Sequence, residues 1–196
     1  MIKTGLNKMR LLNFNFLLKC LSLILILYPI LVYFGLEYVG PTAVLYSLLG
    51  VLFFKIVIST LDKLQRVLMI ASLIIIVVIG SWVSPEIGVK SYPVIVNLSL
   101  FTLFFSSLFM SKNIIEIFAR KMDPTFTEEG VDYTRKVCIA WCLFFIFNGV
   151  MASVSITFSS KIWALYNGFI SYILIGIMFT VEYCVRTFII RKSKRT

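Results

Sequence analysis

The pattern of hydrophobic and polar positions divides the chain into long apolar stretches separated by short polar ones. Each stretch has about 20 residues, and a helix of that length crosses the ~30 Å hydrocarbon core of a bilayer. The pattern predicts an all-α polytopic membrane protein of six transmembrane helices, forming one transmembrane domain over residues 1–196. The predicted spans are residues 13–36, 41–60, 66–84, 93–111, 137–158 and 161–183.

The first apolar stretch follows a basic N-terminal segment, an order that is also typical of a signal peptide. The stretch is too long for a signal peptide, and no small-x-small cleavage site follows it. We therefore expect it to remain as the first transmembrane helix. Pro29 predicts a kink in this helix, with a gating hinge as the functional alternative.

The second and third stretches carry few polar features. Lys55 lies near the polar end of the second span, where its ammonium group can reach the headgroups; a functional buried cation is the alternative. Asp62 lies two helical turns further on and could pair with Lys55 if the helix continues. The third span is an aliphatic run, which favours a lipid-facing helix.

The long connection between the fourth and fifth spans, residues 112–136, has two halves. The first half predicts a short helix lying in the membrane interface, with Lys and Arg opposite an apolar side formed by Ile114, Ile115, Ile117, Phe118 and Met122. Asp123 and Pro124 are expected to end this helix. The spacing of Thr125 and Glu128 is that of a capping box and predicts the start of the next helix.

Composition and charge support a membrane protein and predict its orientation. Hydrophobic residues make up 60% of the chain and charged residues only 14%, whereas soluble domains have about 45–50% and about 25%. Of the 19 Lys and Arg residues, 15 fall on one side of the predicted membrane and two, Lys90 and Lys161, on the other. This asymmetry predicts that both termini are cytoplasmic. Because the basic clusters lie at the ends of apolar stretches, they indicate topology and argue against nucleic-acid binding.

The residues that usually hold metals or cofactors are scarce. Histidine is absent, and the four cysteines are Cys20, Cys138, Cys142 and Cys184. Cys138 and Cys142 share a helical face, but a zinc or haem site would lack a ligand set. We expect free thiols and no metal or cofactor.

The last two spans form a hairpin with a turn of only three residues, Ser159, Ser160 and Lys161. Asn148 precedes the centre of this turn by eleven residues, which places it roughly 17 Å deep, near the midplane of the bilayer. The same count places Asn148 level with Ser171 and Tyr172. It places Asn167 level with Ala152 and Ser153.

Two interpretations of these asparagines remain open. They can form hydrogen bonds between the two helices, each of which would contribute about 0.6–2 kcal/mol to stability. In this interpretation the helices pack closely through the small-residue pairs Gly149-x-x-x-Ser153 and Ala164-x-x-x-Gly168. They can instead form a polar site for a substrate or water. The sequence favours the packing interpretation. Asn97, near the entry of the fourth span, can be satisfied by headgroup water.

Charged residues near the hairpin suggest ion pairs rather than catalysis. Glu182 precedes Arg186 by four residues, the favourable order for a pair on a helix, with a proton relay as the alternative. The acids Glu128, Glu129 and Asp132 lie beside Arg135 and Lys136, which favours a solvated mixed-charge patch over a metal site. No catalytic motif is found in the chain. We predict a protein that is not an enzyme.

Several runs resemble a known family. They are KSYPVIVNLSLFTLFFSSL, IIEIFARKMDP, EEGVDYTRKVCIAWCLFFIFNGVMA and WALYNGFISYILIGIMFTVEYCVR. Together they are similar to an uncharacterised family of bacterial inner-membrane proteins whose genes accompany ketosynthase, acyl-carrier and aryl-polyene-type lipid biosynthesis genes. The fifth span and a tryptophan near the start of the sixth are also similar to the intracellular septation protein A family. The positions that carry the resemblance are Tyr92, Pro93, Asn97, Arg120, Tyr133, Arg135, Trp141, Asn148, Trp163, Tyr166, Asn167, Gly168, Glu182 and Arg186.

The resemblance implies a bacterial inner-membrane location and a role in the cell envelope or in lipid products, and it supplies no catalytic residues. We expect an accessory or scaffold protein whose loop 112–136 meets soluble or membrane partners. A small transporter or flippase with a polar path is the alternative, and a membrane-embedded acyl-modifying enzyme is a third. The candidate functional or packing residues are Asn97, Arg120, Asn148, Asn167, Glu182 and Arg186.

Overall fold

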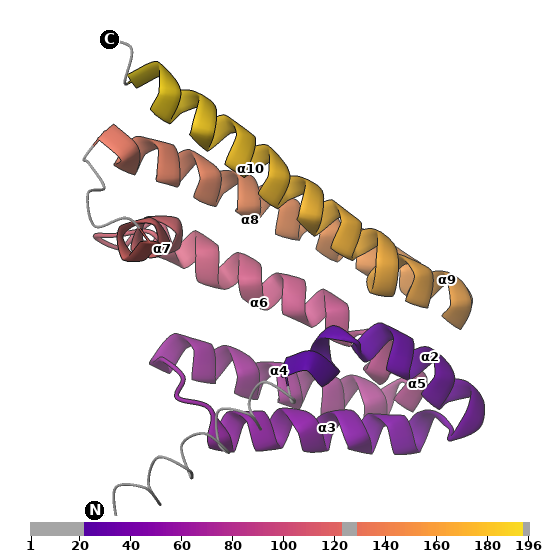
Figure 1. Ribbon diagram of the computed structural model, residues 1–196. Helices are drawn as coiled ribbons and strands as arrows, with labels where there is room; N and C mark the ends of the chain where they lie inside the picture. Colours follow the sequence, from indigo (N-terminus) through magenta and orange to yellow (C-terminus); the bar gives the residue numbers. More distant parts are fainter. Residues whose placement is uncertain (1–21, 123–128, 194–196) are drawn as a thin grey trace, which may run out of the picture. The chain divides into compact units, whose positions relative to one another are not determined.

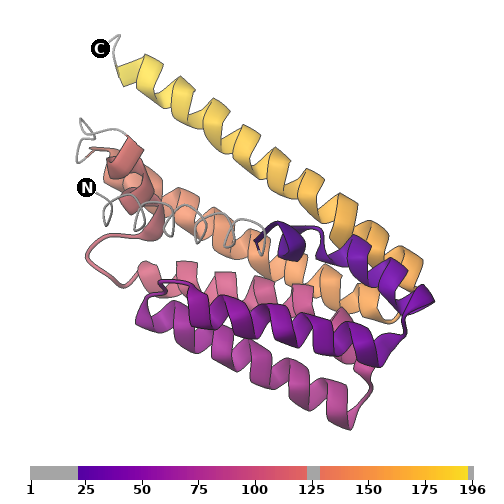
Figure 2. The same cartoon turned by 60° about the horizontal axis from the view of Figure 1, so that its bottom comes forward.

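The computed structural model describes residues 22–122 and 129–193, which are helical apart from short connections and contain no strand (Figures 1 and 2). The chain divides into two compact units, Met1–Tyr92 and Pro93–Thr196, called unit 1 and unit 2 below. The all-α class is therefore confirmed for the described residues. The single transmembrane domain over residues 1–196 stays a prediction.

Unit 1 contains helices whose ends follow from local sequence. They are α2 (Tyr28–Tyr38), α3 (Pro41–Ile58), α4 (Lys63–Trp82) and α5 (Pro85–Lys90). Gly40 precedes α3 with a φ of 98°, a conformation that glycine adopts without a steric penalty. Asp62 caps α4 in a capping box with Gln65, and the Ser84 side chain accepts a hydrogen bond from the backbone N–H of Ile87 in α5.

The first predicted span is interrupted at its middle. Residues 22–26 are helical, the helix breaks at Leu27, and α2 then begins with Pro29 in its first turn. Proline has no backbone N–H and is tolerated there, so the break accounts for the kink predicted at Pro29. Residues 13–21 of this predicted span lie outside the described residues.

The helices of unit 1 meet through glycines. A Cβ added to Gly88 of α5 would lie 2.7 Å from Cα of Gly80 in α4, and one added to Gly80 would lie 2.6 Å from Leu45 Cδ2 in α3. Ser72, Ile76 and Gly80 recur every four residues and form a buried stripe along α4. The expectation that this aliphatic helix faces lipid is therefore wrong for that stripe, although many of its other residues are exposed.

The structure shows the surroundings of two charged residues of unit 1, Lys55 and Lys90. The helix that carries Lys55 ends at Ile58, and Asp62 caps the next helix, so a continuous helix does not bring these two side chains together. The predicted polar break before the fourth span is helix α5, and the Lys90 side chain is only 5% exposed. Its Nζ lies 2.5 Å from Oε1 of Glu86.

Unit 2 contains three long helices and one short helix across their end. Helices α6, α8 and α10 run side by side, and α7 turns across the end at which α6 finishes and α8 begins (Figures 1 and 2). The elements are α6 (Tyr92–Ser107), α7 (Ile114–Met122), α8 (Glu129–Ile156), α9 (Ser160–Leu165), the π-helix η1 (Tyr166–Ile170) and α10 (Ser171–Ser193). The predictions for Asp123, Pro124, Thr125 and Glu128 lie outside the described residues.

An aromatic cluster forms the hydrophobic core of unit 2. Its buried members lie on one side of α8, at Val137, Trp141, Phe144 and Phe145. Phe104 of α6 packs against Phe145 with ring centroids 5.1 Å apart, and Leu174 and Met178 of α10 pack against the same cluster. Cys138 and Cys142 are free thiols buried on this helix, as predicted from their shared face, and exposed Cys184 is also free; Cys20 lies outside the described residues.

Five helical segments in the described residues are long and apolar enough to cross a membrane. They are Pro41–Ile58, Lys63–Trp82, Pro85–Ser107, Gly130–Ile156 and Ser160–Thr187. They correspond to the second to sixth predicted spans, and the chain is a multi-pass membrane protein. The count of six spans and the orientation of the termini stay predictions.

Candidate functional site

Four buried polar side chains meet in the middle of unit 2. Asn148 of α8 donates from Nδ2 to Oδ1 of Asn97 in α6 at 3.0 Å and to Oγ of Ser171 in α10 at 2.9 Å. Its Oδ1 accepts from the hydroxyls of Tyr166, at 2.8 Å, and of Ser171, at 3.1 Å. Asn97 Nδ2 donates to the Pro93 carbonyl of its own helix at 2.8 Å. The count from the turn thus paired Asn148 with Ser171 correctly, whereas the link to Asn97 was not foreseen.

The π-helix η1 lies at this network. Tyr166 is its first residue and Ser171 directly follows its last, so the two hydroxyls that reach Asn148 Oδ1 lie on either side of the wide turn. A π-turn contains one residue more than an α-turn and forms mostly at functional sites or where side-chain contacts hold it. Here the Asn148 carboxamide supplies those contacts. No pattern in the sequence predicted this irregular turn.

Asn167 forms a second polar contact in the same hairpin, nearer the connecting turn. Its Nδ2 donates to Oγ of Ser155 at 3.0 Å and to the Trp163 carbonyl at 2.9 Å. The predicted neighbours were Ala152 and Ser153, two to three residues further from the turn. Side chains on a helix lean toward its N-terminus. Asn167 therefore leans toward the turn and reaches Ser155.

The small residues of the hairpin make contacts that differ from the predicted ones. A Cβ added to Gly149 would lie 3.3 Å from Asn97 Cβ, so Gly149 provides space for α6 rather than for the other arm of the hairpin. Ser153 is exposed, and its hydroxyl donates to the Gly149 carbonyl of its own helix. The Gly149-x-x-x-Ser153 pair is therefore not the contact between the two arms. Fully buried Ala152 and buried Ser155 are the small residues turned inward on α8.

Glu182 and Arg186 form the predicted ion pair, in the second half of α10. Arg186 Nε lies 3.6 Å from Glu182 Oε1, and both side chains are partly exposed. The Arg186 guanidinium also lies 5.7 Å from the centroid of the Tyr183 ring. Tyr133 of α8 donates its hydroxyl to the Glu182 carbonyl at 3.1 Å, which ties the start of α8 to the middle of α10. Because water screens a partly exposed ion pair, this pair contributes little to stability.

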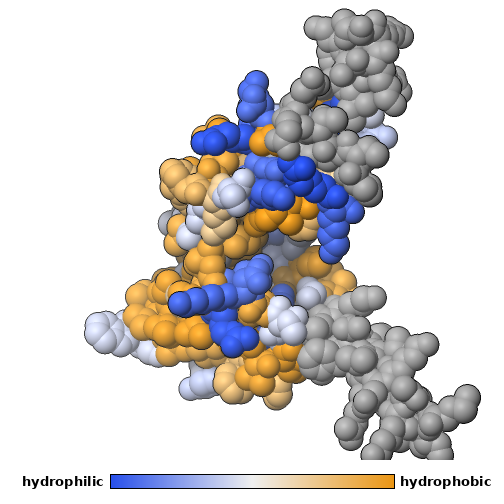
Figure 3. Space-filling model, turned by 90° about the vertical axis from the view of Figure 1, so that its left-hand side faces the viewer, coloured by the Kyte–Doolittle hydropathy of each residue, from blue (hydrophilic) through white to orange (hydrophobic). Residues whose placement is uncertain are grey.

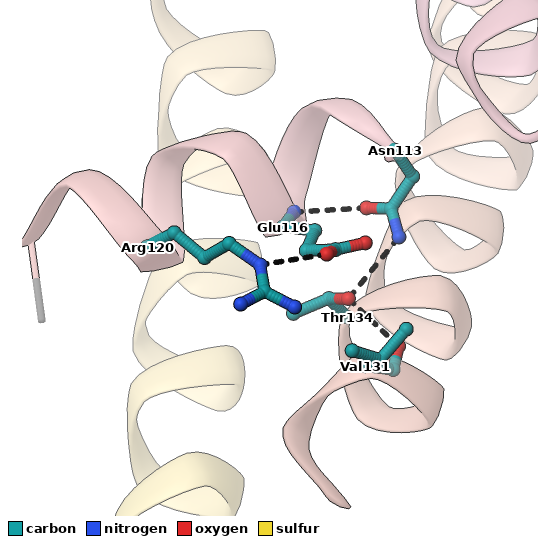
Figure 4. Close-up of polar contacts among 5 residues, drawn as sticks. All are labelled: Asn113, Glu116, Arg120, Val131 and Thr134. Carbon is teal, nitrogen blue, oxygen red and sulfur yellow. Dashed lines mark hydrogen bonds and ion pairs between the residues drawn. The ribbon is translucent and has the colours of Figure 1, made fainter. Parts of the chain in front are cut away.

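Arg120 belongs to a polar cluster that sequence reasoning missed. Arg120 Nε donates to Oε1 of Glu116 at 2.8 Å, and Glu116 is buried. The Asn113 side chain accepts from the Glu116 backbone N–H at 2.9 Å and donates to Thr134 Oγ1 of α8 at 3.1 Å (Figure 4). Asparagine followed three residues later by glutamate is the spacing of a helix N-terminus. That spacing was the available signal for Asn113 and Glu116.

The chemistry available at these sites is hydrogen bonding. Within residues 22–121 and 130–187, whose side chains the structure describes, every fully buried side-chain nitrogen or oxygen atom has a hydrogen-bond partner. The same residues contain no group of three His, Cys, Asp or Glu side chains that could hold a metal ion. The central network is neutral and internally satisfied, so its direct effect is to fix the positions of α6, α8 and α10.

Comparison with protein-family models, with curated proteins and with solved structures finds no match for this chain. The multi-pass membrane class therefore rests on the helices themselves. The resemblance to inner-membrane proteins of lipid-biosynthesis clusters and to the septation protein A family stays a prediction.

Proposed function

We propose that the protein is a non-catalytic accessory or scaffold protein of the bacterial inner membrane, acting in the assembly of cell-envelope or lipid products. The observation that carries the proposal is the polar core of unit 2, where Asn97, Asn148 and Ser171 satisfy one another. Side chains arranged in this way stabilise a rigid helix bundle. A rigid bundle suits a protein that positions partners.

The proposed orientation places both termini in the cytoplasm. In unit 2 the start of α8 is tied to α10 through Tyr133 and Glu182, and α7 packs against α8. Helix α7 and the residues Arg135, Lys136 and Arg186 therefore lie toward the end of the bundle at which α8 begins. Hydrophilic residues gather on the face of the molecule that includes this end, among hydrophobic ones (Figure 3). An excess of Lys and Arg is typical of cytoplasmic membrane faces.

The proposed partner surface is the exposed charged part of this end, formed by Asp132, Arg135 and Lys136. These side chains are exposed, whereas Arg120 is half-buried and paired with buried Glu116. Reversing the charge of Arg120 would place a second carboxylate beside Glu116 and damage the fold. Arg135 and Lys136 are therefore the better positions for testing partner binding.

Site-specific photocrosslinking in native membranes tests this proposal. A photoreactive residue in place of Lys136 is expected to capture a protein of envelope or lipid assembly, and the charge reversal Arg135→Glu in the same chain should abolish the capture. The control carries the photoreactive residue at exposed Lys161, which belongs to the opposite end of the hairpin. Equal capture from both positions, or capture that survives Arg135→Glu in folded protein, would contradict the scaffold proposal.

A small transporter or flippase is the second candidate, and the line of polar groups through the hairpin favours it. Ser155, Asn167, Asn148 and Ser171 follow one another from near the connecting turn toward the middle of the helices. A transporter predicts that Asn148→Leu or Asn167→Leu abolishes flux in reconstituted vesicles while the yield of folded protein is kept. Unchanged flux and unchanged lipid composition after deletion of the gene would exclude it.

A further inference from the structure

Helix α7 is held in one rotational position by polar side chains on its inner side. Asn113 caps the helix and bonds to Thr134, whose hydroxyl in turn donates to the Val131 carbonyl at 2.7 Å (Figure 4). Glu116 is buried on the same side and receives Arg120. Ile115 packs against the aromatic cluster of unit 2. The helix therefore presents its only carboxylate to the protein rather than to the surroundings.

The outer side of α7 is apolar, with positive charge at its ends. Ile117 is 50% exposed and Phe118 is 58% exposed. Lys112, just before the helix, and Lys121, in its last turn, are also exposed. The turn that leads into α7 adds Phe109 and Met110, which are 76% and 59% exposed. Since Glu116 faces inward, the charges of α7 that point outward are positive.

The position of α7 in the bundle places this outer side at the boundary of the bilayer. Helix α6 belongs to the span Pro85–Ser107, and α8 contains the span Gly130–Ile156, so α7 connects two spans at one membrane surface. It turns across their ends rather than continuing along them. A helix in this position lies at headgroup depth, where apolar side chains reach the acyl chains and lysines reach the phosphates.

We propose that the outer side of α7 binds the bilayer surface and selects anionic phospholipids. Ile117 and Phe118 insert at the acyl boundary, and Lys112 and Lys121 bind headgroup phosphates. The sequence predicted an interfacial helix with Ile114, Ile115, Ile117, Phe118 and Met122 on its membrane side. The structure turns Ile115 inward, and the side chain of Met122 lies outside the described residues. The proposal requires only that the chain is a membrane protein and does not depend on the scaffold role.

Fluorescence quenching by brominated lipids tests this proposal on the full-length protein in nanodiscs. Phe118→Trp adds a reporter on α7, and its emission is taken as the difference from the parent protein, which has three tryptophans. Two lipid mixtures contain the same total share of phosphatidylglycerol, and the bromine is carried either by phosphatidylglycerol or by phosphatidylcholine. A basic residue near an anionic surface attracts lipid by about 1 kcal/mol, which is about a fivefold enrichment.

The expected result is stronger quenching of Phe118→Trp by brominated phosphatidylglycerol than by an equal share of brominated phosphatidylcholine. Lys112→Gln and Lys121→Gln should each reduce this preference, by up to about fivefold. Phe147→Trp is the matched control, because Phe147 is a similarly exposed phenylalanine next to Asn148 in the middle of α8. It should be quenched equally by both lipids and should not respond to the lysine substitutions.

Two outcomes would overturn the proposal. If neither brominated lipid quenches Phe118→Trp while both quench Phe147→Trp, the outer side of α7 is not in contact with lipid and is free for a protein partner. If both lipids quench Phe118→Trp equally and the lysine substitutions change nothing, the helix touches the bilayer without selecting anionic headgroups. Neither outcome would bear on crosslinking from Lys136, so the scaffold proposal can stand or fall separately.

Discussion

Unit 1 and unit 2 hold apolar helices together in different ways. In unit 1 the helices approach closely because glycine has no side chain, and Gly80 and Gly88 let the backbones of α4 and α5 touch. In unit 2 the central contact is a network of hydrogen bonds around Asn148. Lipid tails are as apolar as the helices, so burial of apolar surface does not drive helices together in a bilayer. The two units therefore use the two remaining means, close packing and hydrogen bonds.

This difference predicts that the stability of unit 1 depends on the size of the side chains at its helix contacts. The stability of unit 2 is expected to depend on the polarity of its buried side chains. The largest effect is expected for Gly88→Leu, because the new Cβ would lie 2.7 Å from the Gly80 backbone, which cannot move aside as a flexible side chain can. We expect a loss of about 3 kcal/mol in the free energy of unfolding, measured by steric trapping in bicelles.

Gly50→Ala is the matched control for this substitution, since a Cβ at Gly50 would have no atom within 4 Å. Its unfolding free energy should equal that of the parent protein or exceed it by up to about 1 kcal/mol, because alanine favours a helix interior more than glycine does. Equal losses for Gly88→Leu and Gly50→Ala would show that close approach at Gly88 is not what holds unit 1 together.

The second largest effect is expected for Asn148→Leu. The substitution leaves Asn97 Oδ1 and the hydroxyls of Tyr166 and Ser171 without their central partner, and an unsatisfied buried polar group costs about 1–3 kcal/mol. We expect a loss of about 2 kcal/mol in the same unfolding assay.

Ser47→Ala in unit 1 sharpens the comparison. The Ser47 hydroxyl is exposed and donates only to the Ala43 carbonyl of its own helix, so its loss should change stability little. A larger loss for Ser47→Ala than for Asn148→Leu would break the proposed contrast between the two units.

Tyr166→Phe should have a smaller effect, because it removes one hydroxyl and leaves Ser171 bonded to Asn148. We expect a loss of about 1 kcal/mol in the unfolding free energy. Tyr46→Phe, at an exposed tyrosine of unit 1, is the control and should be close to neutral. An equal effect of both substitutions would mean that the network does not contribute to stability.

The smallest effect is expected for Glu182→Gln. The Glu182–Arg186 pair is 3.6 Å long and partly exposed, and such pairs four residues apart on a helix contribute about 0.3–0.5 kcal/mol or less. The loss should decrease further in 0.5 M salt, at a Debye length of roughly 4 Å. A loss comparable to that of Asn148→Leu would assign this pair a role beyond surface stabilisation.

The sequence predicts the helices well and their contacts unevenly. Long apolar runs and their flanking charges locate the spans, because the bilayer fixes their length. Counting from a tight turn pairs Asn148 with Ser171, because both arms of a hairpin rise at the same rate. It does not pair Asn148 with Asn97, which belongs to a helix separated by a long connection.

Other features depend on three-dimensional packing that a one-dimensional pattern does not contain. The contact of Gly80 with Gly88 needs the crossing point of α4 and α5. The burial of Glu116 needs Thr134 of the following helix and Asn113 at the cap. The sequence of the π-helix η1, YNGFI, has no unusual composition. The wide turn lies beside the Asn148 carboxamide, whose oxygen accepts hydrogen bonds from the hydroxyls of Tyr166 and Ser171 at the two ends of the turn.

The π-turn also determines which side of α10 faces the bundle. Each residue of an α-helix advances the chain by about 100° around the axis, so removal of the one extra residue of the π-turn would rotate everything beyond it by about that angle. Leu174 and Met178, which pack on the aromatic cluster, would then turn away from it. The angular position of a 23-residue helix thus depends on one asparagine outside it.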